Sequence, residues 1–156
     1  MNKWIKLLIF ILICQLAGLV GSNFTTSQIN GWYATLQKPS FTPPNWLFGF
    51  VWTILFILMG ISLYWIWGKR LERNFRKAIL FFGIQLVLNI LWNFFFFGLQ
   101  NPSYGLIEII LLWIAIAITI FEFYKLSKKA GLILLPYIIW VSIATVLNYY
   151  ILVLNA

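Results

Sequence analysis

Five long apolar runs fill most of the chain and are separated by short polar connections. Each run holds about 19–24 residues, and because an α-helix rises about 1.5 Å per residue, each can cross a hydrocarbon core about 30 Å thick. The pattern predicts an all-α fold in a single domain, residues 1–156: an integral membrane bundle of five transmembrane helices. The predicted spans are 4–22, 46–67, 78–99, 103–124 and 131–154.

The longest connection, residues 23–45, carries the only clear turn chemistry. Thr25 and Gln28 have the spacing of a capping box, which predicts a short helix that starts there and ends at Lys38, before Pro39. Thr42 followed by two prolines predicts the N-cap and first turn of the second span. The segment holds four aromatic residues, Phe24, Trp32, Tyr33 and Phe41, and Trp46 follows it directly. We expect it to fold as a lid over the bundle; the alternative is a helix lying in an aromatic interfacial belt.

Positive charge lies on alternate connections. Ten of the 11 Lys and Arg residues precede or open the first run or fall between runs two and three or four and five, whereas Lys38 alone falls on the other set. By the positive-inside rule, this distribution predicts a cytoplasmic N-terminus and, with five spans, a C-terminus outside. The localisation expected is an integral protein of a bacterial cell membrane.

Composition narrows the possible functions. Hydrophobic residues make up 63% of the chain and charged residues 9%, which argues against a soluble protein. The net charge of +8 does not indicate nucleic-acid binding, because the cations sit at span ends, where they meet lipid headgroups. The chain has no His and a single Cys, so no metal site, disulfide or cofactor is expected. For the first run, a cleaved signal peptide is the alternative.

Amide and indole side chains share one depth within the predicted bundle. Asn89 and Asn93 lie one turn apart on the third span, and Asn148 lies in the outer half of the fifth, on the face of Trp140 and Ala144. An unpaired amide in hydrocarbon is costly, so these side chains must face the bundle interior. They either join helices or form the polar points of a pocket.

Eight of the nine tryptophans, all except Trp32 in the lid segment, divide by depth in the same way. Those near span ends fit an interfacial belt: Trp4, Trp46, Trp65 and Trp67. Four others are too deep for a belt: Trp52, Trp92, Trp113 and Trp140. Deep indoles suit a flat, conjugated, largely apolar ligand that stacks on them.

Two acids lie within spans. Glu122 is three residues before Lys125 and is expected to pair with it. Glu108 is about one and a half turns inside the outer end of the fourth span. It is a functional candidate as an intramembrane acid, or it reaches the interface by snorkelling. Pro136 is expected to kink the fifth span.

Three stretches carry a resemblance to a known family. They are 32–53, with Trp-Tyr, Lys-Pro-Ser-Phe-Thr-Pro-Pro-Asn-Trp and Val-Trp-Thr; 88–93, with Leu-Asn-x-x-Trp-Asn; and 136–148, with Pro-Tyr-x-x-Trp-Val-Ser-x-Ala-Thr-x-Leu-Asn. The chain resembles the tryptophan-rich sensory protein family, also called the translocator protein or peripheral-type benzodiazepine receptor family, in its bacterial type. The resemblance covers nearly the whole chain.

The resemblance implies a five-helix bundle, often a homodimer, with a cavity beneath the first loop. It implies a membrane receptor for porphyrin or tetrapyrrole ligands such as protoporphyrin IX, with light-dependent porphyrin degradation in some bacterial members and a role in tetrapyrrole or oxidative-stress regulation. Trp52 and Trp140 match the tryptophans tied to the photochemistry. Cholesterol recognition is not expected, because no basic residue follows Tyr149 and Tyr150.

Depth and resemblance together define the predicted site. The expected partners are a porphyrin or other flat apolar ligand, the lipid bilayer and a second copy of the chain, with no nucleic acid. A transporter or facilitator of tetrapyrroles or small amphiphiles is the alternative function, and a regulatory protein acting through a partner is a third. The predicted ligand-binding residues are Trp32, Tyr33, Pro44, Trp52, Asn89, Trp92, Asn93, Trp140, Ala144 and Asn148.

Overall fold

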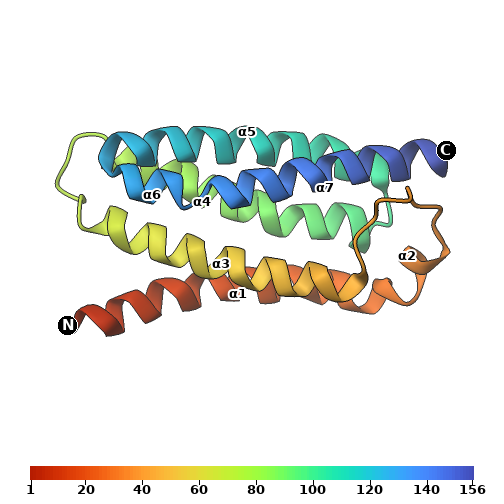
Figure 1. The fold of residues 1–156 in the computed structure, drawn as a ribbon, viewed down its shortest axis with the longest axis horizontal. Helices are drawn as coiled ribbons and strands as arrows, with labels where there is room; N and C mark the ends of the chain where they lie inside the picture. Colours follow the sequence, from red (N-terminus) through yellow and green to blue (C-terminus); the bar gives the residue numbers. More distant parts are fainter.

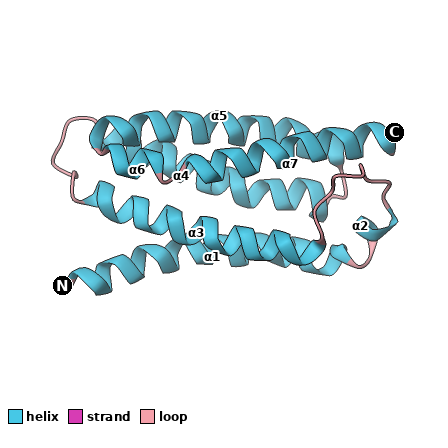
Figure 2. Ribbon diagram, in the orientation of Figure 1, coloured by secondary structure: helices cyan, strands magenta, loops and turns pink.

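The computed structural model describes all 156 residues and contains helices and loops without strands (Figure 2). Five helices or helix pairs are long and apolar enough to cross a membrane. The all-α, five-span prediction is therefore confirmed. The elements are α1 (Lys3–Ile29), α2 (Trp32–Thr35), α3 (Asn45–Trp67), α4 (Phe75–Asn93) continued by a π-helical turn η1 (Phe94–Gly98), α5 (Pro102–Leu126), α6 (Lys128–Leu132) and α7 (Leu135–Leu154).

The helices form an elongated bundle with the two termini at opposite ends (Figure 1). α1 packs against α3, while α5 packs against both α4 and α7, and α1 also contacts α4. The α1–α3 contact is close because Gly60 lacks a side chain: a Cβ at this position would lie 2.4 Å from the Cα of Ile11. Small residues of this kind let helix backbones approach where lipid provides no hydrophobic drive for association.

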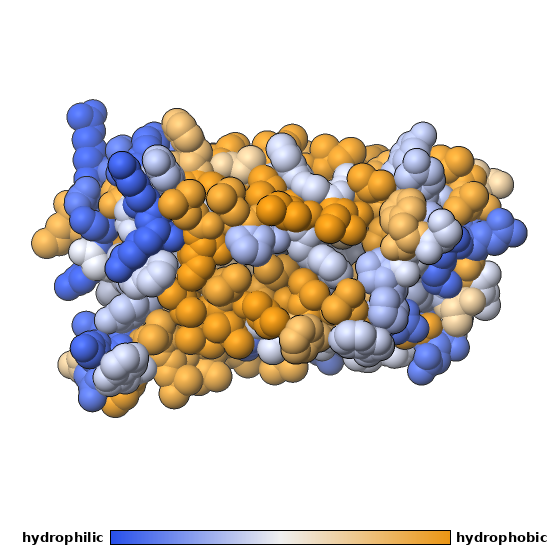
Figure 3. Space-filling model, in the orientation of Figure 1, coloured by the Kyte–Doolittle hydropathy of each residue, from blue (hydrophilic) through white to orange (hydrophobic).

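On the face shown in Figure 3, the middle of the molecule is mostly apolar and hydrophilic residues gather toward both ends. Apolar side chains that point outward are numerous along every long helix, for example Leu16, Val87 and Ile139. In water such a surface would be an aggregation liability, whereas in a bilayer it is the surface that contacts lipid tails. The molecule is an integral membrane protein.

The start of the lid differs from the prediction made by its capping box. α1 continues through Thr25 to Ile29 instead of ending before it. The Thr25 hydroxyl donates a 2.6 Å hydrogen bond to Oδ1 of Asn93 on α4, and the backbone at Thr25 remains helical. Because α1 is continuous here, Thr25 is not an N-cap, and its hydroxyl instead joins α1 to α4. The short helix that follows is only α2, and its C-cap residue Leu36 has an extended backbone.

The second span also begins differently from its prediction. Pro44, not Thr42, occupies the N-cap position of α3, and no side chain caps this end. The Thr42 hydroxyl instead donates to the carbonyl of Pro39 at 2.7 Å, which closes a turn in the lid. The expected irregularity in the last span is present: α6 ends at Leu132, and Pro136 lies in the first turn of α7, where a proline costs no helical hydrogen bond.

Candidate functional site

A cavity of about 370 Å³ lies beneath the lid, between α1, α3, α4 and α7. Its volume falls in the range of about 300–1,000 Å³ typical of small-ligand pockets. No Asp, Glu, Lys or Arg lines it. Part of its border is open, because Leu19 on α1 and Trp46 on α3 line it and are 62% and 70% exposed.

Aromatic rings form two walls of the cavity. On α3, Trp52 stacks on Phe56 with 5.7 Å between ring centroids, and its edge meets Tyr137 at 6.2 Å. On the other wall, Trp92 stacks on Phe96 at 5.1 Å and meets Phe97 edge-on at 5.7 Å. Rings held by other rings lose little freedom when a ligand stacks on them, so the walls are pre-organised for a flat apolar molecule.

Amide side chains supply the polar points, and each is held by a neighbouring element. Asn148 on α7 accepts a hydrogen bond from Nε1 of Trp92 at 3.1 Å and donates to the carbonyl of Pro102 at 2.9 Å. Asn89 donates to the hydroxyl of Tyr137 at 2.8 Å, and that hydroxyl donates to Oε1 of Gln85 at 2.7 Å. Each amide nitrogen has two hydrogens, so one donor on Asn89 and one on Asn148 remain for a ligand. The amides join helices and also face the cavity.

The lid closes the outer end through aromatic contacts. Tyr33 on α2 is 6% exposed, lines the cavity, and packs on Phe97 at 5.6 Å between centroids. Trp32 meets Phe96 edge-on at 5.6 Å. Burial raises the pKa of Tyr33, so its hydroxyl remains a hydrogen-bond donor at neutral pH. These contacts confirm the lid interpretation of the first loop.

The middle of the lid is attached to the residue that follows the last span. The backbone N–H of Gln37 donates to Oδ1 of Asn155, and Nδ2 of Asn155 donates back to the carbonyl of Gln37, both at 2.9 Å. Beside this pair, the ring of Phe41 meets that of Tyr150 edge-on at 5.6 Å. The lid is therefore fixed at two points, by α2 against η1 and by Gln37 against Asn155 at the end of α7.

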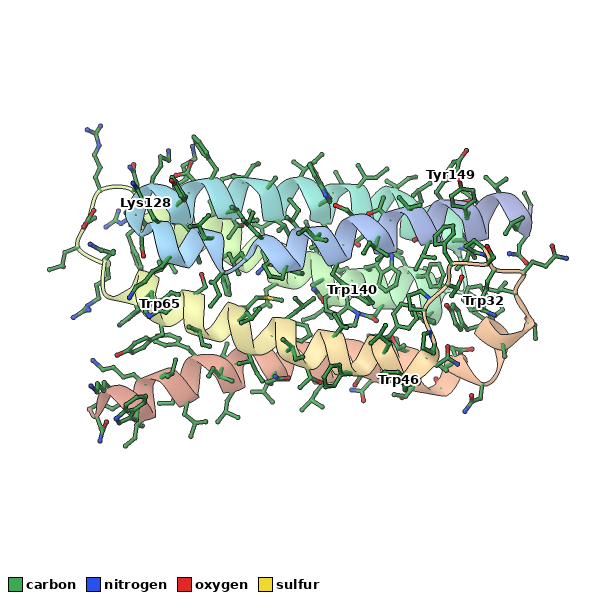
Figure 4. All side chains as sticks on the ribbon, in the orientation of Figure 1. Trp32, Trp46, Trp65, Lys128, Trp140 and Tyr149 are labelled. Atoms are coloured by element: carbon green, nitrogen blue, oxygen red, sulfur yellow. The ribbon has the colours of Figure 1, made fainter.

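Seven of the ten predicted ligand-binding residues line this cavity, and three do not. The seven are Tyr33, Trp52, Asn89, Trp92, Asn93, Ala144 and Asn148. Trp32 packs behind Phe96, and Pro44 precedes α3 next to the lining residue Asn45. Trp140 on α7, labelled in Figure 4, has its ring against Phe48 at 5.7 Å between centroids, and Phe48, not Trp140, lines the cavity. The Nε1 of Trp140 is buried without a hydrogen-bond partner.

Several lining residues were missed by the sequence prediction. The phenylalanines Phe48, Phe56, Phe96 and Phe97 belong to the walls, and Trp46, which was assigned to an interfacial belt, borders the opening. The run of four phenylalanines at 94–97 was a visible signal. It could not be assigned to a face, however, because the π-helical turn η1 changes the angular spacing of side chains there. Trp113 lies elsewhere and donates to Ser142 at 2.8 Å.

The two acids within spans have different surroundings. Oε1 of Glu122 forms an ion pair with Nζ of Lys125 at 3.1 Å, as predicted, and a second one with Nζ of Lys77 at 3.4 Å. Glu108 is 5% exposed, and neither of its carboxyl oxygens has a hydrogen-bond partner. It is therefore buried rather than snorkelling to the interface. Glu108 does not line the cavity, but it lies one turn from Gly105, where an added Cβ would be 3.0 Å from Oδ1 of Asn148.

Comparison with known proteins gives consistent matches over nearly the full length. The TspO/MBR family model matches residues 10–154. The chain is 47% identical to the tryptophan-rich protein TspO of Chlorobaculum tepidum, over 99% of both chains. It is 49% identical to the tryptophan-rich protein TspO of Archaeoglobus fulgidus, over 97% of this chain and 98% of that one. It is 32% identical to the tryptophan-rich sensory protein of Cereibacter sphaeroides, over 97% and 92%.

Proposed function

This chain belongs to the TspO/MBR family, and from that premise we propose that it is a membrane receptor whose cavity binds protoporphyrin IX or a related flat tetrapyrrole. The family membership and the five spans support a receptor or sensor in a membrane. The identity of the ligand is the proposal. Its biological role would be the sensing or removal of a photoreactive tetrapyrrole.

The observation that carries this proposal is the composition of the cavity walls. Two stacked indole–phenyl pairs, Trp52 with Phe56 and Trp92 with Phe96, stand on separate helices around one uncharged space. A macrocycle offers a wide π-face to such rings and polar nitrogen atoms to the free amide hydrogens of Asn89 and Asn148. A small rigid polar metabolite would use few of these contacts.

Light-driven degradation is the enzymatic form of the proposal. A photoexcited macrocycle, or oxygen activated by it, would oxidise a neighbouring indole, and Trp52 is the tryptophan with a place in the cavity wall beside Tyr137. The contribution of the protein would be to hold ring against ring and to exclude competing reactions. Trp140 would take part only through an electron transfer past Phe48.

Titration of the detergent-solubilised protein with protoporphyrin IX tests both forms. Tryptophan fluorescence should be quenched with a saturable dependence on porphyrin, in the dark as well as in light. The absorption spectrum of bound porphyrin should then change only under illumination if degradation occurs. Protein that is never quenched rules out the receptor and the enzyme together, whereas quenching without a spectral change leaves a receptor that sequesters the ligand.

Transport of tetrapyrroles or small amphiphiles is the second candidate. The observation in its favour is Glu108, a buried carboxyl without a hydrogen-bond partner in a membrane-spanning helix, which is a frequent feature of proton-coupled carriers. Porphyrin flux into liposomes that contain the protein, abolished by Glu108→Gln, is the result this candidate requires. Liposomes that remain impermeable to porphyrin would remove it.

The cellular setting belongs to the same proposal. The protein would lie in a bacterial cell membrane, as a homodimer, with its N-terminus in the cytoplasm and its C-terminus outside. Ser27 and Asn74 are exposed near opposite ends of the bundle. In intact cells, a membrane-impermeant maleimide should label Ser27→Cys and spare Asn74→Cys, both made in a background without the native cysteine. Preferential labelling at position 74 would reverse the orientation.

A further inference from the structure

One positive charge is separated from all the others. Lys38 lies in the lid, whereas the ten remaining Lys and Arg residues precede or open α1 or lie at the connections α3–α4 and α5–α6. Lys128 in Figure 4 marks that opposite, basic end of the bundle. No charged residue lines the cavity itself. Along the sequence, Lys38 is the cation nearest to a cavity-lining residue, Tyr33 in the outer wall.

The ammonium group of Lys38 is positioned against that wall. Its Nζ lies 4.6 Å from the ring centroid of Tyr33, which lines the cavity. Nζ donates one hydrogen bond, to the carbonyl of Leu36 at 3.2 Å, and it takes part in none of the three ion pairs of the molecule. An ammonium has three donors, so two remain for another partner.

The backbone next to Lys38 is held in place. The peptide groups of Gln37 make two hydrogen bonds with Asn155, both 2.9 Å long, and Pro39 restricts the chain on the other side. The lysine is thus presented from a fixed point beside the cavity's outer end, and only its side chain must move to meet a ligand. A pre-positioned charge loses less entropy on binding than one on a mobile loop.

We propose that Lys38 is the anion-binding point of this cavity, and that it selects flat apolar ligands that carry a carboxylate at one edge. This inference rests on the proposed function for the apolar body of the ligand and adds its charge and orientation. The uncharged, aromatic interior would impose a large desolvation cost on a carboxylate. The ligand therefore enters with its apolar body inside and its carboxylate at the lid, where Lys38 pairs with it.

Protoporphyrin IX and its dimethyl ester provide the test, because they share one macrocycle and differ in the charge at one edge. Affinities for both are measured by fluorescence quenching in the dark, with wild-type protein, K38M, K38R and the control K128M, which removes a lysine at the other end. We expect K38M to weaken binding of the acid about three- to tenfold, the range for a partly exposed charge-assisted contact. Binding of the ester should not change, and K38R and K128M should bind the acid as wild type does.

The two ligands separate the failure of this inference from the failure of the proposed function. If the wild-type protein binds neither acid nor ester, the receptor function is lost and this inference with it. If it binds both and K38M binds the acid as tightly as wild type, Lys38 is not the anion-binding point. Equal weakening of acid and ester in K38M would show that the lysine only supports the lid, which also overturns the proposal.

Discussion

Replacing Asn148 by leucine removes the amide that joins three elements at the cavity wall. Its Oδ1 accepts from Nε1 of Trp92 and its Nδ2 donates to the carbonyl of Pro102, and the side chain is 1% exposed. Leucine has a similar volume, so the change removes hydrogen bonds without opening a large cavity. The indole N–H of Trp92 is then left without an acceptor in a low-dielectric site.

The size of the effect follows from which group is left unpaired. An orphaned, partly buried donor costs about 1–3 kcal/mol, whereas a hydrogen bond between membrane helices contributes about 0.6 kcal/mol on average. The carbonyl of Pro102 lies in the first turn of α5 and can still accept the helical bond of its own helix. We therefore expect Asn148→Leu to reduce the free energy of unfolding by about 1–2 kcal/mol, close to the cost of the orphaned indole alone.

Ligand affinity should fall as well, because the remaining amide hydrogen of Asn148 faces the cavity. The loss of one such polar point is expected to weaken porphyrin binding by about 1 kcal/mol, or roughly fivefold in Kd. The assay is fluorescence quenching, with affinity expressed per folded molecule and stability measured by thermal unfolding in the same detergent. Ser142→Ala is the matched control, since it also removes the acceptor of an indole N–H, that of Trp113, away from the cavity.

A double-mutant cycle of Asn148→Leu, Trp92→Phe and the double variant tests the cause of the lost stability. If the orphaned N–H causes the loss of stability, removing it should restore part of that loss, so the two changes together should cost less than their sum. The reasoning is refuted if Asn148→Leu leaves both stability and affinity at wild-type values. It is also refuted if Ser142→Ala weakens binding as much, because the effect would then not depend on the cavity.

Two further predictions concern single side chains. Trp52→Phe should reduce light-driven porphyrin turnover more than Trp140→Phe, because of these two tryptophans Trp52 alone lines the cavity. Equal turnover per folded molecule in Trp52→Phe and wild type would falsify the catalytic assignment of Trp52. Gly60→Ala should lower the free energy of unfolding by about 1–3 kcal/mol, since the added Cβ would lie 2.4 Å from the backbone of Ile11. Gly83→Ala, whose added Cβ would meet no neighbouring atom within 4 Å, should instead raise it by about 0.5–1 kcal/mol. The opposite order of the two variants would contradict the close α1–α3 packing.

The sequence alone determined the number of spans and the depth of their polar residues. Apolar length and helical rise are local properties, so the five runs correspond to α1, α3, α4 with η1, α5, and α6 with α7. Counting along those runs placed Asn89, Asn93 and Asn148 at one level, and all three line one cavity. Hydrocarbon leaves an amide no other low-energy position, which is why the inference from depth succeeded.

Only the tertiary structure decided which face of each helix meets the cavity and where α1 ends. Trp140 and Asn148 are eight residues apart, and at about 100° per residue this spacing turns the helix by about 80° beyond two full turns. The cavity wall on α7 therefore includes Asn148 and Ala144 but leaves Trp140 behind Phe48. Likewise, α1 continues past Thr25, whose hydroxyl donates to Asn93 on another helix. A hydrogen bond between residues 68 positions apart is set by packing, not by local pattern.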